Sequence, residues 1–267
     1  MKLSRAAKRT LLAIMAIGFT FIYLPLLLVV INSFNTNKSF AWPPTGFTTE
    51  WWSKAAVNEG IRDAVMRSFF TALIATFIAL ILGSLAAAAI TRYDFFGRNT
   101  ISLLFVLPIA LPGIVTGIAL NNVFTNFFGK LTFFTIVIGH ATFCIVVVFN
   151  NVAARYRRLG INLQEASMDL GANRFTTFRL VTFPLIRNAL VAGGLLAFGL
   201  SFDEIVVTTF TAAPGIQTLP IWIYNNLFRP NQAPIVNVVA ATLILFSLIP
   251  IYLSQRLSSD STSGGKL

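Results

Sequence analysis

The chain has 267 residues, of which 56% are hydrophobic and only 11% are charged. A water-soluble fold of this composition would leave large apolar patches in solvent, which soluble monomers rarely do. The formal net charge of +11 does not indicate nucleic acid binding, because the basic residues lie in short connections rather than on one face. We therefore predict an all-α integral membrane protein in contact with lipid.

Six apolar stretches are long enough to cross a hydrocarbon core of about 30 Å as helices, which takes roughly 20 residues each. The expected spans are residues 11–31, 68–90, 101–120, 133–150, 189–209 and 235–253. Together they form a single transmembrane domain, with a polar connection at 151–188. The tail at 257–267 is rich in serine and glycine, and we expect it to be disordered.

The basic residues predict the orientation of the chain. If both termini lie in the cytoplasm, 14 of the 20 Lys and Arg residues lie inside. The six outside are Lys38, Lys54, Arg62, Arg67, Lys130 and Arg229. This excess is typical of cytoplasmic loops. The first span begins like a signal peptide but lacks a small-residue cleavage pattern, so we expect a retained helix.

Small residues and prolines mark the second and third spans. Gly83 and the alanines at 86–89 predict close approach of another helix. Pro108 and Pro112 each remove a backbone donor, so the third span should bend or break. A bend beside a pathway and a kink used only for packing both fit this pattern.

The polar connection carries two short helical patterns. Asn162 can cap the first, with Glu165 completing a capping box, and Gly171 fits a left-handed stop. Asn173 can cap the second helix, which carries Phe175.

The helical period predicts two faces for the first of these helices. The face expected to pack on the spans carries Leu163, Ala166 and Leu170, and the other carries Glu165, Met168 and Asp169. A solvated connecting loop fits these two patterns as well as a docking segment does.

The order Glu165-Ala166-Ser167, then Gly171 six residues after the glutamate, then Phe183-Pro184, resembles the EAA loop of permease subunits in type I ATP-binding-cassette (ABC) importers. Ser167 replaces the usual second alanine, and Phe183 stands where leucine often precedes the proline. The resemblance implies a MetI-like permease fold, in which residues from 165 to about 174 form a coupling helix seated on a cytoplasmic ATPase. The residues to which it gives this contact role are Glu165, Ala166, Asp169, Gly171, Arg174 and Phe175.

The resemblance also implies the partners. They are a second permease subunit, expected to form a heterodimer with this chain, two ATPase subunits and an extracytoplasmic solute-binding protein, at the bacterial cytoplasmic (inner) membrane. The sequence has no G-x-x-x-x-G-K-[ST] loop to hold nucleotide phosphates. We therefore expect no cofactor on this chain, with ATP and Mg²⁺ on the ATPase subunits, and we expect no enzymatic activity of its own.

Asp203 and Glu204 are the only acidic residues that we place inside a span. A carboxylate there costs ~2.5 kcal/mol or more near a helix centre, so it faces a cavity or a partner. Two adjacent acids would attract a cation; alternatively they are hydrated, or bond to another subunit or to freed backbone groups near Ser201. The run 201–210, followed by Thr218-Leu219-Pro220, is similar to spermidine/putrescine permeases, which implies a polyamine solute.

His140 and Cys144 lie one helical turn apart in the fourth span. Two ligands on one helix do not make a closed zinc site, so we predict no metal. His140 either bonds to a neighbouring helix or lines the substrate pathway together with Asp203 and Glu204.

Two other functions remain open. A self-contained ion-coupled carrier or channel would use Asp203, Glu204 and His140 as a relay. Such carriers commonly show paired broken helices, whereas the sequence indicates one interrupted span. A non-transporting membrane scaffold is the third possibility. No set of residues suited to nucleophilic or metal-assisted hydrolysis is present in the sequence.

Overall fold

The computed structural model describes residues 4–38, 42–159, 162–229 and 231–246. The chain divides into two compact units, Met1–Arg62 with Ile223–Leu267, and Asp63–Trp222. Within the described ranges the regular structure is helical, apart from one isolated bridge between Asn35 and Phe47. This all-helical architecture agrees with the predicted fold class.

The first unit contains α1 (Arg5–Asn32) and α2 (Glu50–Ala56). The Ser4 hydroxyl caps α1 by accepting a hydrogen bond from the Ala7 N–H. Trp51 in α2 is only 6% exposed, and its indole Nε1 donates to the Asn35 carbonyl at 2.8 Å. The ring of Trp51 therefore packs inside this unit.

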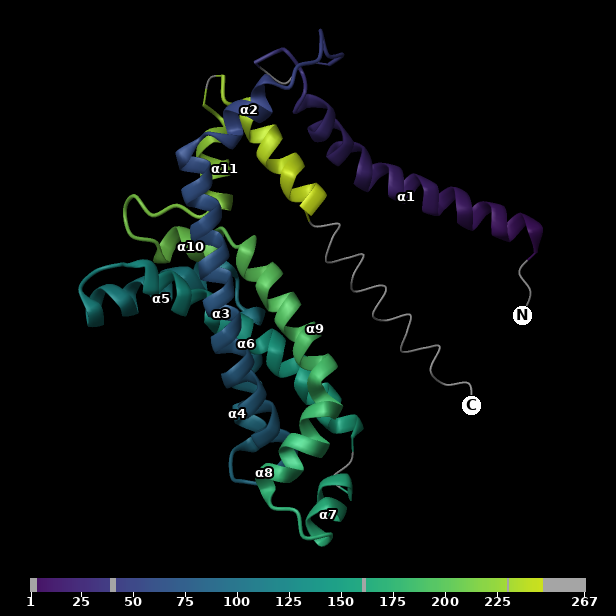
Figure 1. Cartoon of the computed structure of the whole chain (residues 1–267), viewed down its shortest axis with the longest axis vertical. Helices are drawn as coiled ribbons and strands as arrows, with labels where there is room; N and C mark the ends of the chain where they lie inside the picture. The colour runs from purple at the N-terminus through teal and green to yellow at the C-terminus, as the bar shows by residue number, and fades with distance from the viewer. Residues whose placement is uncertain (1–3, 39–41, 160–161, 230, 247–267) are drawn as a thin grey trace. The chain divides into compact units, whose positions relative to one another are not determined.

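Three long helices form the body of the second unit: α3 (Glu59–Arg92), most of which belongs to it, α6 (Phe133–Arg158) and α9 (Phe183–Phe202). They run side by side in Figure 1, and buried residues from all three share one apolar core that includes Ala79, Phe149 and Ala197. Gly83 allows α3 to approach α6 closely, since a Cβ there would lie 2.8 Å from the Ile145 carbonyl oxygen. The predicted close approach at Gly83 is confirmed.

Gly83→Leu is expected to destabilise the protein by about 1–3 kcal/mol or more, because the new side chain would meet the backbone of α6. Gly199→Leu on α9 is the matched control, since nothing lies within 4 Å of a Cβ at that position. Thermal unfolding of the purified protein in detergent measures both. Equal melting temperatures for the two variants would contradict this packing.

The third expected span is not one continuous helix over 101–120. It consists of α4 (Arg98–Ala110) and α5 (Gly113–Phe128), which are bent by 105°. Leu111 between them is extended, as the residue before a proline tends to be, and Pro112 starts the new direction. The predicted break is confirmed, and it falls at Pro112 rather than at Pro108, which stays inside α4.

The fifth expected span, 189–209, is also wrong at its end. Helix α9 stops at Phe202, residues 203–205 are not helical, and α10 (Val206–Thr211) follows, then α11 (Leu219–Leu227). Asp203 and Glu204 therefore lie in a break between two helices rather than inside a span. The Glu204 carboxylate satisfies one of the backbone groups left free at the start of α10.

Other boundaries shift as well. Helix α6 continues to Arg158, so the connection expected at 151–188 begins later than predicted. Among the described residues, four helices are long and apolar enough to cross a membrane, and the α4–α5 pair gives a fifth candidate. Of the sixth expected span, residues 235–246 are helical and belong to the helix Ala233–Phe246. Residues 247–253 and the tail at 257–267 lie outside the described residues.

Candidate functional site

The connection between α6 and α9 contains α7 (Asn162–Asp169), α8 (Arg174–Thr177) and a π-helical turn, η1 (Phe178–Thr182), that leads into α9. Figure 1 shows α7 and α8 at one end of the second unit. Asn173 caps α8, as predicted, because its side chain accepts from the Thr176 N–H at 2.8 Å. Asn162 is the first residue of α7 rather than its cap.

Gly171 ends α7 in the left-handed conformation, with φ of +87°. The Gly171 N–H donates to the Met168 carbonyl, and the Ala172 N–H donates to the Ser167 carbonyl. These two bonds form the Schellman motif that closes many helices. The predicted stop at Gly171 is confirmed.

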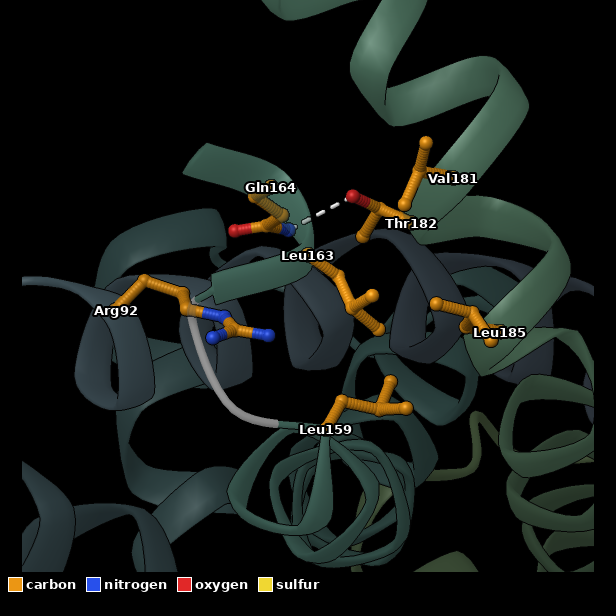
Figure 2. A pocket seen from close by; sticks show the side chains of 7 residues that line it. All are labelled: Arg92, Leu159, Leu163, Gln164, Val181, Thr182 and Leu185. Carbon is orange, nitrogen blue, oxygen red and sulfur yellow. Dashed lines mark hydrogen bonds between the residues drawn. The ribbon is translucent and has the colours of Figure 1, made fainter. Parts of the chain in front are cut away.

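The face of α7 that contacts the rest of the unit is polar, not the predicted apolar one. Gln164 Nε2 donates to Thr182 Oγ1 at 2.7 Å (Figure 2), and the hydroxyls of Ser167 and Thr177 lie 3.0 Å apart. Leu170, expected on the inner face, is 90% exposed. Side-chain hydrogen bonds to α8 and η1 therefore decide which way α7 faces.

Of the predicted inner face, Ala166 is exposed, and only Leu163 reaches the packed side. It lines a small pocket with Leu159 and Leu185 (Figure 2), although half of its own surface stays exposed. The apolar contact of α7 with the unit is thus small. The two hydroxyl-containing pairs make the main connection.

All six residues predicted to contact a partner are exposed on α7, α8 and the turn between them. They are Glu165, Ala166, Asp169, Gly171, Arg174 and Phe175. Within the described residues, neither Glu165 nor Asp169 forms an ion pair. Exposed apolar side chains indicate an interaction site, and the same short segment carries Leu170 and Phe175 (72% exposed).

Glu204 has a structural contact in the break between α9 and α10. Its carboxylate Oε1 accepts from the Val207 N–H at 2.8 Å, which caps the start of α10. Of the alternatives that the sequence left open, the bond to freed backbone groups is therefore observed for Glu204. Asp203 is exposed at the same break. The expected contact of both residues with a substrate stays a prediction.

His140 on α6 is fully buried and connects to both sides of this break. Its Nδ1 lies 2.7 Å from Ser201 Oγ, and its Nε2 lies 2.7 Å from Thr208 Oγ1. Thr208 Oγ1 donates to the Glu204 carbonyl. This assigns the ring proton to Nε2 and makes Nδ1 the acceptor from Ser201.

The structure therefore shows the predicted bond from His140 to a neighbouring helix, while its role in a pathway stays a prediction. Cys144 and His140 have different hydrogen-bond partners. Its thiol Sγ donates to the Ala197 carbonyl on α9 at 3.3 Å. Sequence reasoning missed the partners of His140, although Ser201 and Thr208 stand seven residues apart around the Asp203-Glu204 pair.

His140→Leu is expected to destabilise the protein by about 1–3 kcal/mol, because it leaves the buried Ser201 hydroxyl without its acceptor. Adding Ser201→Ala to His140→Leu should recover part of this loss. Melting temperatures of the two single variants and the double variant, in detergent, measure the coupling. Strictly additive effects would mean that the bond between His140 and Ser201 contributes nothing.

The chain matches a protein family, several relatives in sequence and a solved structure. Residues 79–261 match the family described as "Binding-protein-dependent transport system inner membrane component". The chain is 33% identical over 246 residues to the spermidine/putrescine transport system permease protein PotC of Escherichia coli strain K12, which covers 92% of each chain. It is 35% identical over 242 residues to the putrescine transport system permease protein PotI of the same strain, covering 88% of this chain and 85% of the relative.

A more distant relative is the putative 2-aminoethylphosphonate transport system permease protein PhnV of Salmonella typhi, at 27% identity over 90% of this chain and 92% of the relative. Among solved structures, the chain is similar to a bacterial ABC transporter involved in the import of the acidic polysaccharide alginate. The TM-score is 0.72 at 15% identity, covering 96% of this chain and 99% of that one. This similarity shows a shared fold.

Proposed function

We propose that this chain, which belongs to the family of binding-protein-dependent transport system inner membrane components, forms one half of the membrane pathway of an ATP-driven importer. The family is that of ABC importer permease subunits, which are not themselves enzymes. The chain thus contributes passage and coupling, while ATP is hydrolysed on separate subunits.

The observation that carries the coupling role is the position of α7, exposed on its outer side and bonded on its inner side to α8 and η1. Gln164 hydrogen-bonds to Thr182, the last residue before α9, and Ser167 hydrogen-bonds to Thr177. Because η1 continues directly into α9, a displacement of α7 is passed to a membrane helix both by these bonds and by the chain. An ATPase that binds one arrangement of α7 better than another shifts the helices accordingly.

The assembly that fits this role has four further components. They are a second, similar permease subunit forming a heterodimer with this chain, two ATPase subunits that hold ATP and Mg²⁺, and a solute-binding protein on the outer side. In this arrangement the chain lies in the bacterial inner membrane with α7 and both termini in the cytoplasm. The excess of basic residues on that side supports the orientation.

The solute that fits best is a small polyamine such as putrescine or spermidine. The similarity to PotC and PotI supports this class. The exposed Asp203 carboxylate lies at a helix break, where backbone and charge can face a water-filled route. A polyamine is a multiply charged cation, and a carboxylate beside such a route raises its local concentration.

One observation favours the ion-coupled carrier as the second candidate. Among the described residues, the chain is interrupted not only at the bend between α4 and α5 but also between α9 and the short α10, where the sequence indicated one interruption. Paired broken helices are common in such carriers. In the importer, the same breaks would instead flank the passage shared with the second permease subunit.

Reconstitution into vesicles separates the two functions. The importer predicts putrescine uptake only when the second permease subunit, the ATPase subunits, ATP and the solute-loaded binding protein are all present. It also predicts that the loaded binding protein stimulates ATP hydrolysis. Uptake by this chain alone, driven by an ion gradient, would contradict the importer and support the carrier.

A further inference from the structure

We propose that a cavity between α7, α8 and the adjoining ends of α3 and α6 binds the phosphate of an anionic lipid headgroup. This cavity has a volume of about 330 Å³. Its polar lining includes Arg92 at the end of α3, Tyr156 on α6, Gln164 and Glu165 on α7, and Arg174 at the start of α8. The site goes beyond the proposed function, which assigns no lipid to the chain.

Arg92 lines this cavity with a side chain that is held in a fixed position. Its guanidinium carbon lies 5.0 Å from the centre of the Tyr156 ring, a cation–π contact that holds the group in place. Its Nε is buried and has no hydrogen-bond partner among the described residues. Because so little of this atom's surface is accessible, only a water-sized group can reach it, and a ligand in the larger cavity would contact the terminal guanidinium nitrogens instead.

Arg92 lines two spaces of different size. Arg92 also lines the small pocket drawn in Figure 2, where its side chain extends beneath α7. That pocket has a volume of only about 10 Å³, which is room for one water-sized group at most. The larger cavity, which Arg92 also lines, can accommodate a tetrahedral phosphate.

The charge of the lining favours an anion. Arg92 and Arg174 bring two positive charges and Glu165 brings one negative charge. Within the described part of the chain, neither arginine forms an ion pair. Guanidinium groups bind phosphate oxygens with two parallel hydrogen bonds, so this lining suits a phosphate better than a neutral ligand.

The place of the cavity favours a lipid as the source of the phosphate. Arg92 is the last residue of an apolar helix, and the neighbouring end of α6 carries Arg155, Arg157 and Arg158. Basic residues directly beside a span lie at headgroup level and attract anionic lipids. Ala88, Met168 and Phe178 give the same cavity an apolar side, which suits the glycerol end of a lipid.

Native mass spectrometry of the assembled, delipidated complex, titrated with phosphatidylglycerol or phosphatidylcholine, tests the proposal. Wild type should bind phosphatidylglycerol at least tenfold more tightly than Arg92→Gln, and phosphatidylcholine weakly. Arg92→Lys keeps the charge but loses the planar guanidinium group, and should fall between them. Arg98→Gln is the control, because Arg98 pairs with Asp94 and does not line this cavity, and it should bind as wild type does.

Three results would overturn the proposal. Arg92→Gln could retain phosphatidylglycerol as well as wild type does. Inorganic phosphate at millimolar concentration could occupy the site and displace the lipid, which would assign it to a soluble anion. Binding could also appear only after the ATPase subunits are removed from the complex, which would assign Arg92 to a carboxylate of that partner. Lipid binding is measured without transport, so its failure is distinguishable from failure of the importer function.

Discussion

Gly171→Asp and Glu165→Arg are each expected to abolish solute uptake while the chain still inserts into the membrane. Gly171 has a φ of +87°, which a side chain disfavours, so the substitution disturbs the stop that sets the end of α7. Glu165 is exposed on that helix, so reversing its charge opposes a partner that fits a carboxylate. Both changes act at the surface where we place the ATPase.

Putrescine uptake and ATP hydrolysis by the reconstituted complex measure these effects, with membrane fractionation to confirm insertion. Gly97→Asp is the matched control, because Gly97 has a similar φ of +82° and, like Gly171, nothing within 4 Å of a Cβ. Its uptake should stay near that of wild type. Normal uptake by both α7 variants would remove the coupling role of this helix.

Asp203→Asn combined with Glu204→Gln is expected to lower putrescine uptake at low concentration by roughly tenfold or more, since the field that concentrates a cation is lost. Glutamine at 204 keeps a side-chain oxygen that can still accept from the Val207 N–H. The loss therefore reports the charge and not the cap of α10.

Initial uptake rates measured over a range of putrescine concentrations test this variant. Asp94→Asn removes a carboxylate in the α3–α4 connection and serves as the control, with rates near those of wild type. Because attraction acts on the approach of the solute, the double variant should lose most at low concentration and recover at high concentration. Unchanged uptake at every concentration would exclude an acidic entrance.

The features that the sequence predicted well are those with local causes. A glycine after a short amphipathic run predicted the left-handed stop at Gly171, and an asparagine before the next run predicted the cap at Asn173. Pro112 breaks its span because its ring and missing N–H act within a few residues. Gly83 allowed a close helix contact to be expected, although not the identity of the facing helix.

The features that the sequence did not predict depend on partners far along the chain. Hydrogen bonds to the hydroxyls of Thr177 and Thr182 determine which face of α7 contacts the unit. The apolar pattern of Leu163 and Leu170 does not, since Leu170 is exposed. His140 bonds to residues more than 60 positions away, and no local pattern identifies them. The end of α9 was predictable in part, because two adjacent carboxylates in an apolar run suit a helix terminus better than a helix interior.

The side of the membrane on which α7 lies tests the central claim most directly. A cysteine placed at exposed Asp169 can be labelled with a membrane-impermeant maleimide, and buried Cys144 gives little background. The coupling role predicts labelling from the cytoplasmic side only, and protection of that cysteine when the ATPase subunits are bound. Labelling from the outer side, or equal labelling with and without the ATPase subunits, would contradict it.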